Sequence, residues 1–126
     1  SRVRMTDVTD GTSSTTLVVE TAGRPVVYYN RAVQSSVSND QGICWADSEG
    51  PYSLDRASSD GASEAGGTAC ASPMNRKNNN EPYGFHTGGI NVLFGDGRVQ
   101  FVRESIPLPM FAALTTRAAS EVTSID

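Results

Sequence analysis

The clearest alternation of hydrophobic and polar positions lies at residues 90–102. In a strand over residues 90–94, Ile90, Val92 and Phe94 fall on one face. Asn91 and Leu93 fall on the opposite face. A second alternating run, 99–102, follows Gly95-Asp96-Gly97-Arg98. Asp-Gly at this place favours a type I′ turn, which needs positive φ at both central residues. The pattern predicts a β-hairpin, and its partly apolar faces favour a central place in a sheet.

Weaker patterns predict the other elements. Residues 15–21 are rich in β-branched side chains and predict a strand, and residues 26–29 predict a second, shorter one. Ser105 is placed to cap a short helix that has Pro107 in its first turn. Apolar positions then recur at helical spacing, at Leu108, Phe111, Ala112 and Leu114. These elements predict an α+β fold: an antiparallel β-sheet with a C-terminal hairpin, a short C-terminal helix and a long loop. The βαβ alternation of doubly wound nucleotide-binding folds is missing.

Length and composition limit the size of the core and the choice of partners. The 126 residues fit one globular domain, 1–126, or the C-terminal fragment of a larger protein. A hydrophobic content of 37% with 12 glycines predicts a modest core and long loops. The formal net charge of −4 argues against a nucleic-acid partner. No apolar run approaches the ~20 residues that a membrane span needs.

The two cysteines enclose the least periodic part of the chain. Cys44 and Cys70 flank a Gly- and Ser-rich loop, and a chain with one histidine offers few further ligands for a structural metal site. A disulfide between them suits an exported protein and would stabilise the fold by ~3 kcal/mol. The alternative is two buried free thiols in a reducing compartment.

His86 is the only histidine, so it is the natural candidate for acid-base chemistry. No nucleophile motif such as Gly-x-Ser-x-Gly accompanies it. We therefore predict a structural imidazole that bonds the backbone entering the hairpin, with a ligand or metal contact as the alternative. Structural roles in turns and strand entries are also predicted for Asp10, Gly11, Gly88, Gly89, Asn91, Asp96 and Gly97.

Hard oxygen donors gather in the long loop and just after it. Calcium prefers such ligands, and a calcium site is possible among Asp47, Asp55, Asp60, Asn78, Asn80 and Glu81. Their spacing is not that of an EF-hand, so a solvated acidic loop is the alternative. Aromatic side chains accompany them at Trp45, Tyr52, Tyr83 and Phe85. These rings are expected to pack the loop onto the sheet, and the alternative is that they line a small pocket.

Taken together, the motifs resemble those of a large bacterial family. The string Phe-His-x-Gly-Gly-x-Asn-Val-Leu-Phe-x-Asp-Gly at 85–97 resembles its C-terminal signature. Residues 9–17 resemble a second family segment that Glu20 closes, and 45–47 and 78–86 resemble two more. The tail at 113–118 resembles the family's ending. Its members are pseudopilin-like proteins of unknown function, with a prepilin-type N-terminus, and are sometimes labelled solute-binding.

The resemblance implies a non-enzymatic structural subunit. Such a protein is expected outside the cytoplasm, at the cell surface, in the periplasm or in the extracellular space. Its expected partners are copies of itself or other pilin-like subunits, in a pilus-like filament or a secretion-type assembly. Membrane contact would come only through an N-terminal helix absent from this chain. The major pseudopilins of type II secretion bind calcium in a C-terminal loop, which is an analogy for the acidic loop here.

Two other functions remain open at this point. One is a binding module for a solute, glycan or peptide, with Trp45, Tyr52 and Tyr83 as stacking groups. The other is an enzyme that uses His86 and a carboxylate as acid and base. Because the chain lacks a recognisable catalytic motif, we rank the enzyme last.

Overall fold

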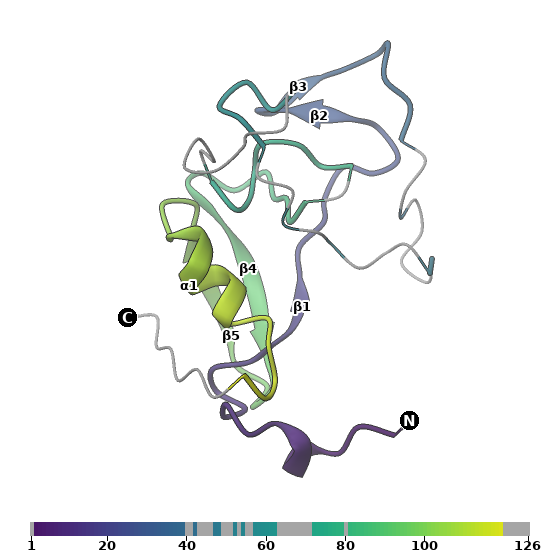
Figure 1. Cartoon of the computed structure of the whole chain (residues 1–126). Coiled ribbons are helices and arrows are strands. Elements are labelled where there is room, and N and C mark those ends of the chain that lie inside the picture. Colours follow the sequence, from purple (N-terminus) through teal and green to yellow (C-terminus); the bar gives the residue numbers. More distant parts are fainter. Residues whose placement is uncertain are drawn as a thin grey trace.

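The computed structural model describes residues 2–39, 42, 47–48, 52, 54, 57–62, 72–79 and 81–119. Its elements are, in chain order, the 3-10 helix η1 (Met5–Asp7), β1 (Thr16–Val19), β2 (Tyr28–Tyr29), β3 (Ala32–Val33), β4 (Gly89–Phe94), β5 (Val99–Arg103) and the helix α1 (Leu108–Ala113). The strands form a three-stranded sheet in the order β1-β4-β5 and a two-stranded sheet of β2 and β3. Figure 1 shows the larger sheet together with α1 and the smaller sheet at the other end of the molecule. The prediction of antiparallel strands and one short helix near the C-terminus is confirmed.

The predicted hairpin is present, but its turn differs from the prediction. β4 and β5 pair antiparallel, with Leu93 opposite Val99. The N–H of Gly97 donates to the carbonyl of Phe94 at 3.0 Å, and Gly97 has a φ of +88°, whereas Asp96 does not have a positive φ. The connection is therefore a three-residue loop that ends in a left-handed glycine, and the predicted type I′ turn is wrong. The side chain of Asp96 stabilises the loop by accepting the N–H of Arg98 at 2.9 Å.

A two-residue hairpin turn with positive φ at both positions occurs instead at Asn30 and Arg31. Their φ angles are 47° and 69°, and they join β2 to β3 with Tyr29 opposite Ala32. Asn tolerates this conformation readily, but Arg does so rarely. Tertiary contact holds Arg31 there, because its N–H donates to the hydroxyl of Tyr83 at 2.7 Å.

The core lies between α1 and one face of the three-stranded sheet. Alternation along β4 turns Ile90, Val92 and Phe94 toward this face, and all three are fully buried. Among the described residues the core cluster also includes Val19, Met74, Val102, Ile106, Phe111 and Leu114. The predicted apolar side of the helix is confirmed at Phe111 and Leu114, since both are fully buried.

The start of α1 was predicted wrongly. Pro107, in extended geometry with φ −60° and ψ 137°, is the residue before the helix, and no side chain caps it. Ser105 instead precedes Ile106, whose N–H donates to the carbonyl of Arg103 at 3.0 Å. A residue that precedes a proline avoids helical geometry, so Ile106 stays outside the helix and Ser105 lies too far back to cap it.

Asn78 organises the end of the molecule that carries β2. Its side chain is fully buried and its Oδ1 accepts the N–H of Tyr28 at 2.8 Å. Its Nδ2 donates to the carbonyls of Ala22 at 3.1 Å and Val26 at 2.8 Å. One amide thus satisfies three backbone groups on the segment that leads into β2. The side chain of Asn78, which the sequence suggested as a calcium ligand, is therefore engaged in backbone hydrogen bonds.

The predicted disulfide falls in the part of the chain that the structure leaves undescribed. Cys44 and Cys70 both lie outside the described residues. The bond between them stays a prediction.

Candidate functional site

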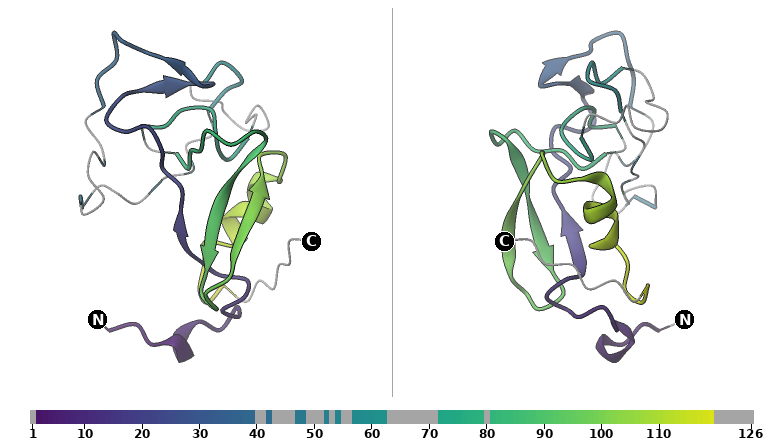
Figure 2. Two further views of the ribbon diagram at one scale, coloured as in Figure 1. Left: turned by 180° about the vertical axis from the view of Figure 1, so that it is seen from behind. Right: turned by 60° about the vertical axis from the view of Figure 1, so that its left-hand side comes forward.

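Among the described residues, no helix or strand packs on one face of the three-stranded sheet, and this face is largely apolar. Figure 2 shows α1 against one side of the sheet only. On the other side Val18 and Val99 lie opposite Leu93 in the register, and they are 58% and 63% exposed. Phe101 lies in the next row, opposite Asn91, and is 42% exposed. We refer to Val18, Leu93, Val99 and Phe101 as the outer strip.

Three polar side chains meet at one end of the outer strip. Glu20 follows β1, Asn91 lies in β4, and His86 lies in the loop before β4. The Nε2 atom of His86 is 3.1 Å from Oε1 of Glu20 and 3.1 Å from Nδ2 of Asn91. The other carboxylate oxygen of Glu20 accepts the backbone N–H of Asn91. We refer to these three residues as the Glu-His-Asn cluster.

The surroundings of the cluster fix its position. The ring of Phe101 meets the imidazole of His86 edge to face, with the centroids 6.3 Å apart. The guanidinium of Arg31 donates to the carbonyl of His86 at 2.7 Å and lies 3.9 Å from the carboxylate of Glu104. A side chain at Gly84 would place its Cβ 3.0 Å from Oε2 of Glu20, so the glycine leaves room for the carboxylate.

The imidazole of His86 was expected to bond the backbone that enters the hairpin. In the structure its ring contacts the side chains of Glu20 and Asn91. The backbone carbonyl of His86, and not its ring, accepts a hydrogen bond from the guanidinium of Arg31. The side chain of His86 is 55% exposed. The residue therefore faces solvent and is available to a ligand.

The other motif residues serve the backbone. Gly11 and Gly88 have φ angles of +92° and +83°, and a side chain at either would meet no atom within 4 Å. Gly89 differs, because its Cβ would lie 2.1 Å from the carbonyl oxygen of Val102 and 2.8 Å from the ring of Phe101. The backbone carbonyl of Val102 therefore excludes a side chain at this position, and the ring of Phe101 narrows the space further.

Asp10 links the segment before β1 to the segment that follows α1. Its carboxylate accepts the hydroxyl of Thr116 at 3.2 Å and the N–H of Ala119 at 2.9 Å. The sequence predicted a structural role for Asp10 at a turn or strand entry, whereas these two donors come from the C-terminal segment.

The residues considered as calcium ligands either accept hydrogen bonds from the backbone, form no metal-binding group, or lie outside the described residues. Glu81 is buried, and its two oxygens accept the N–H groups of Ala57 at 3.1 Å and Lys77 at 3.4 Å. Asp60 accepts the N–H of Ala62 at 2.9 Å. Within the described part of the chain, which includes Asp47, no three His, Cys, Asp or Glu side chains gather as a metal site. Asp55, Asn80 and Trp45 lie outside the described residues, so a calcium site in this loop stays a prediction.

The aromatic residues that were predicted to pack the loop, as far as the structure describes them, lie in two separate places. Tyr52 lies beside Phe111, with ring centroids 6.3 Å apart, and Phe85 meets Tyr28 edge to face at 5.0 Å. Tyr83 is fully buried, and its burial raises the pKa of its phenol, an effect that the hydrogen bond from the N–H of Arg31 opposes. Tyr52 and Tyr83 therefore do not form one stacking platform.

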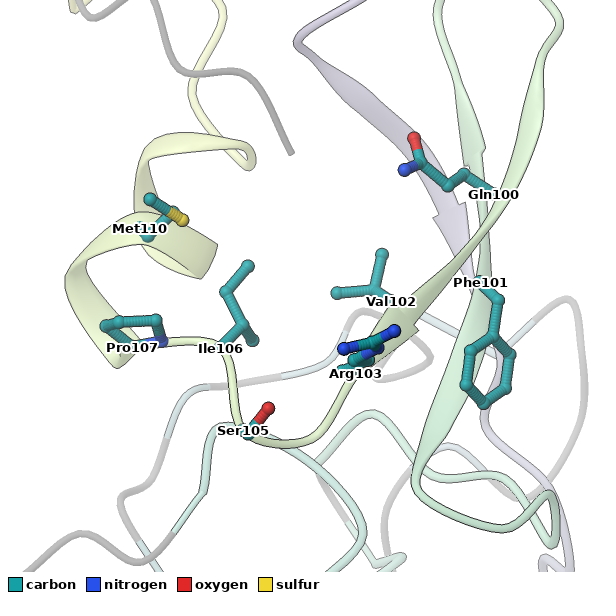
Figure 3. A pocket seen from close by; sticks show the side chains of 8 residues that line it. All are labelled: Gln100, Phe101, Val102, Arg103, Ser105, Ile106, Pro107 and Met110. Atoms are coloured by element: carbon teal, nitrogen blue, oxygen red, sulfur yellow. The ribbon is translucent and has the colours of Figure 1, made fainter. Parts of the chain in front are cut away.

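A shallow groove lies between β5 and the start of α1 (Figure 3). Its volume is about 370 Å³, and it was not predicted from the sequence. In Figure 3 the side chains of Val102 and Ile106 face the groove, while Phe101 points to the other side of β5. The described residues that line it are Gln100, Phe101, Val102, Arg103, Ser105, Ile106, Pro107 and Met110.

Comparison with known families decides the relationship. The model of a family described as "Protein of unknown function (DUF1559)" matches residues 1–108. The chain belongs to the DUF1559 family. The match covers all strands that the structure describes and the whole Glu-His-Asn cluster, and it ends where α1 begins. No curated protein and no solved structure matches this DUF1559 chain.

The sequence singled out some site residues of this DUF1559 chain and missed others. His86 and Asn91 were marked by their motif, whereas Glu20 stood out only as the last residue of a family-like segment. Arg31 carried no signal, because its role depends on the turn that places it. No helix among the described residues is long and apolar enough to cross a membrane.

Proposed function

We propose that this chain is a non-enzymatic structural subunit: the exported head of a pseudopilin-like protein that assembles with copies of itself or with other pilin-like subunits. The supporting observation is the outer strip. An antiparallel sheet with one solvated face usually carries polar side chains there. Here Val18 and Val99 are more than half exposed, with Leu93 between them in the register. Such a strip favours burial against a partner.

The energy available from that burial is sufficient to matter. Fully burying a large apolar side chain contributes about 1.5–3 kcal/mol. The outer strip has four such residues, three of them more than 40% exposed. A partner that covers the strip would therefore gain several kcal/mol before its ordering costs. Membership in the DUF1559 family and the resemblance to pseudopilin-like proteins are consistent with a partner of the same kind.

The same proposal assigns a location and an anchor. The head would work outside the cytoplasm, at the cell surface, in the periplasm or in the extracellular space. Contact with a membrane would come through an N-terminal helix outside this chain.

Sedimentation and electron microscopy of the intact, processed protein test the proposal. We expect filaments or large assemblies from the wild type and their loss in Val99→Lys, because a lysine in the outer strip resists burial. The matched control is Val33→Lys, which changes an equally exposed valine (56%) on β3. A wild-type protein that stays monomeric, or two variants that assemble equally, would contradict the structural role.

The groove supports a second candidate function, a module that binds a solute, glycan or peptide. Its volume of about 370 Å³ is within the range of small-molecule sites. Members of the family are sometimes labelled solute-binding. Because Tyr83 is buried, a ligand would depend on the groove and not on the stacking groups proposed from the sequence.

Thermal-shift screening tests this second function. A ligand at 100 times its Kd should add ~2.7 kcal/mol to the free energy of unfolding. A true groove ligand should lose this effect in Met110→Glu, which changes an exposed residue of the lining, but keep it in Val33→Lys. No shift with any sugar or peptide would remove this candidate.

A further inference from the structure

We propose that Glu20, His86 and Asn91 bind a divalent transition-metal ion at the end of the outer strip. The inference is independent of the structural role proposed above. It concerns three side chains that two separate motifs bring together, with the imidazole exposed to solvent. The ligand class is a borderline divalent cation such as Zn²⁺, Ni²⁺ or Co²⁺.

The spacing from His86 to each of its two neighbours fits a shared ion. The Nε2 atom of His86 is 3.1 Å from Oε1 of Glu20 and 3.1 Å from the amide end of Asn91. Two ligands bonded to one ion at ~2.1 Å are separated by roughly 3.0 Å in an octahedral site and 3.4 Å in a tetrahedral one. The observed separations fall between these values, so an ion can enter with small side-chain movements.

Direct hydrogen bonds satisfy the cluster incompletely. A protonated Nε2 of His86 can donate to Glu20, but its N–H and the amide N–H of Asn91 are then two donors that face each other without an acceptor. An unprotonated Nε2 can accept from Asn91, but its lone pair then faces the carboxylate oxygen of Glu20. A half-turn of the Asn91 amide presents Oδ1 to the ring in place of Nδ2. With Nε2 unprotonated, the carboxylate, the imidazole and the amide oxygen then each offer a lone pair within the cluster, as ligands of a cation do.

The backbone positions two of the ligands before any ion arrives. Glu20 uses Oε2 to accept the N–H of Asn91, which leaves Oε1 for the ion. Asn91 lies in β4, the central strand of the sheet. The ring of Phe101 flanks His86 on the side of the outer strip. Preorganised ligands lose less entropy on binding than ligands on free loops.

The donor set selects the class of metal. One imidazole nitrogen and two oxygens suit zinc, nickel and cobalt better than calcium, which takes six to eight oxygens. Three protein ligands leave at least one coordination position open, and the half-exposed imidazole places that position at the surface. Water or a donor from another molecule would complete the site.

Metal titration of the purified protein tests the site. Binding of Zn²⁺ is measured by calorimetry after chelator treatment, and the imidazole resonances of His86 are followed by NMR, with their assignment made from His86→Gln. We expect saturable binding that shifts these resonances. Glu20→Gln should weaken the affinity by at least about tenfold, and Asn91→Asp should tighten it by about tenfold because a second carboxylate joins the site. Glu104→Gln, which removes a nearby charge outside the cluster, should leave it unchanged.

Each other result overturns the proposal. Absence of zinc binding up to millimolar concentration would do so, and so would binding that leaves the His86 resonances unmoved. Equal affinity in the wild type and in Glu20→Gln would show binding by a lone imidazole. If Glu20→Gln fails to fold, the comparison of the wild type with Asn91→Asp decides, and an unchanged affinity in that variant rejects the site.

Discussion

Asn78→Ala removes an amide that three backbone groups need. In the wild type the N–H of Tyr28 and the carbonyls of Ala22 and Val26 all bond the Asn78 side chain, at 2.8 to 3.1 Å. The side chain is fully buried. Alanine at this position leaves those groups without a protein partner.

The expected cost follows from the number of groups left unsatisfied. A buried polar group without a partner costs about 1–3 kcal/mol. Water that enters the vacated space offsets part of this, so we expect Asn78→Ala to lower the free energy of unfolding by about 3–5 kcal/mol. Asn78→Asp should cost at least as much, because its carboxylate accepts from Tyr28 but repels two carbonyls. Since a domain of this size is stable by about 5–15 kcal/mol, either variant loses a large share of its stability.

Urea unfolding, followed by fluorescence and circular dichroism, measures the effect. Asn79→Ala is the matched control, since the buried Oδ1 of Asn79 has no hydrogen-bond partner among the described residues. We expect that variant to unfold close to the wild-type midpoint. A loss below 1 kcal/mol in Asn78→Ala, or an Asn78→Asp variant more stable than Asn78→Ala, would refute the hydrogen-bond account.

Three further predictions concern the turn, the cysteines and the tyrosines. Gly97→Val should cost about 1–3 kcal/mol through its positive φ, and Gly97→Asn much less; equal melting temperatures would reject the left-handed turn. If Cys44 and Cys70 are bridged, peptide mapping finds the linked pair only without reductant, and reduction costs ~3 kcal/mol; a free-thiol count of two would reject the bond. Because burial raises the pKa of Tyr83 above that of the unfolded chain, the stability it provides is present below pH ~10 and is lost as the pH rises through the folded pKa. Tyr83→Phe should flatten this alkaline loss in unfolding experiments, and an unchanged slope would contradict it.

Local patterns predicted the elements more reliably than their connections. The β4–β5 hairpin follows from alternation within a short run, and the buried side of α1 follows from helical spacing. The turn type was missed because Phe94 pairs with Arg98 across three residues, not two. The turn at Asn30 and Arg31 was missed because arginine rarely takes positive φ, and the Tyr83 hydroxyl that holds it is distant in the sequence.

The candidate site could be predicted only in part, for the same reason. His86 and Asn91 lie within one motif, so their proximity was accessible from the sequence. Glu20 joins them only because β1 pairs with β4, with Val19 opposite Val92. That register also exposes Val18, and neither consequence follows from the local pattern of β1.

The pairing of β1 with β4 also orders the steps of folding. The β4–β5 hairpin closes through a three-residue loop. The pairing of Thr16 with Phe94, in contrast, requires closure of the whole segment between β1 and β4. Closing such a long segment costs more entropy and slows folding, so β1 should join after the hairpin and the helix have met. Until then one edge of β4 has unpaired N–H and C=O groups. A newly made chain thus passes through a period in which another strand can take the place of β1.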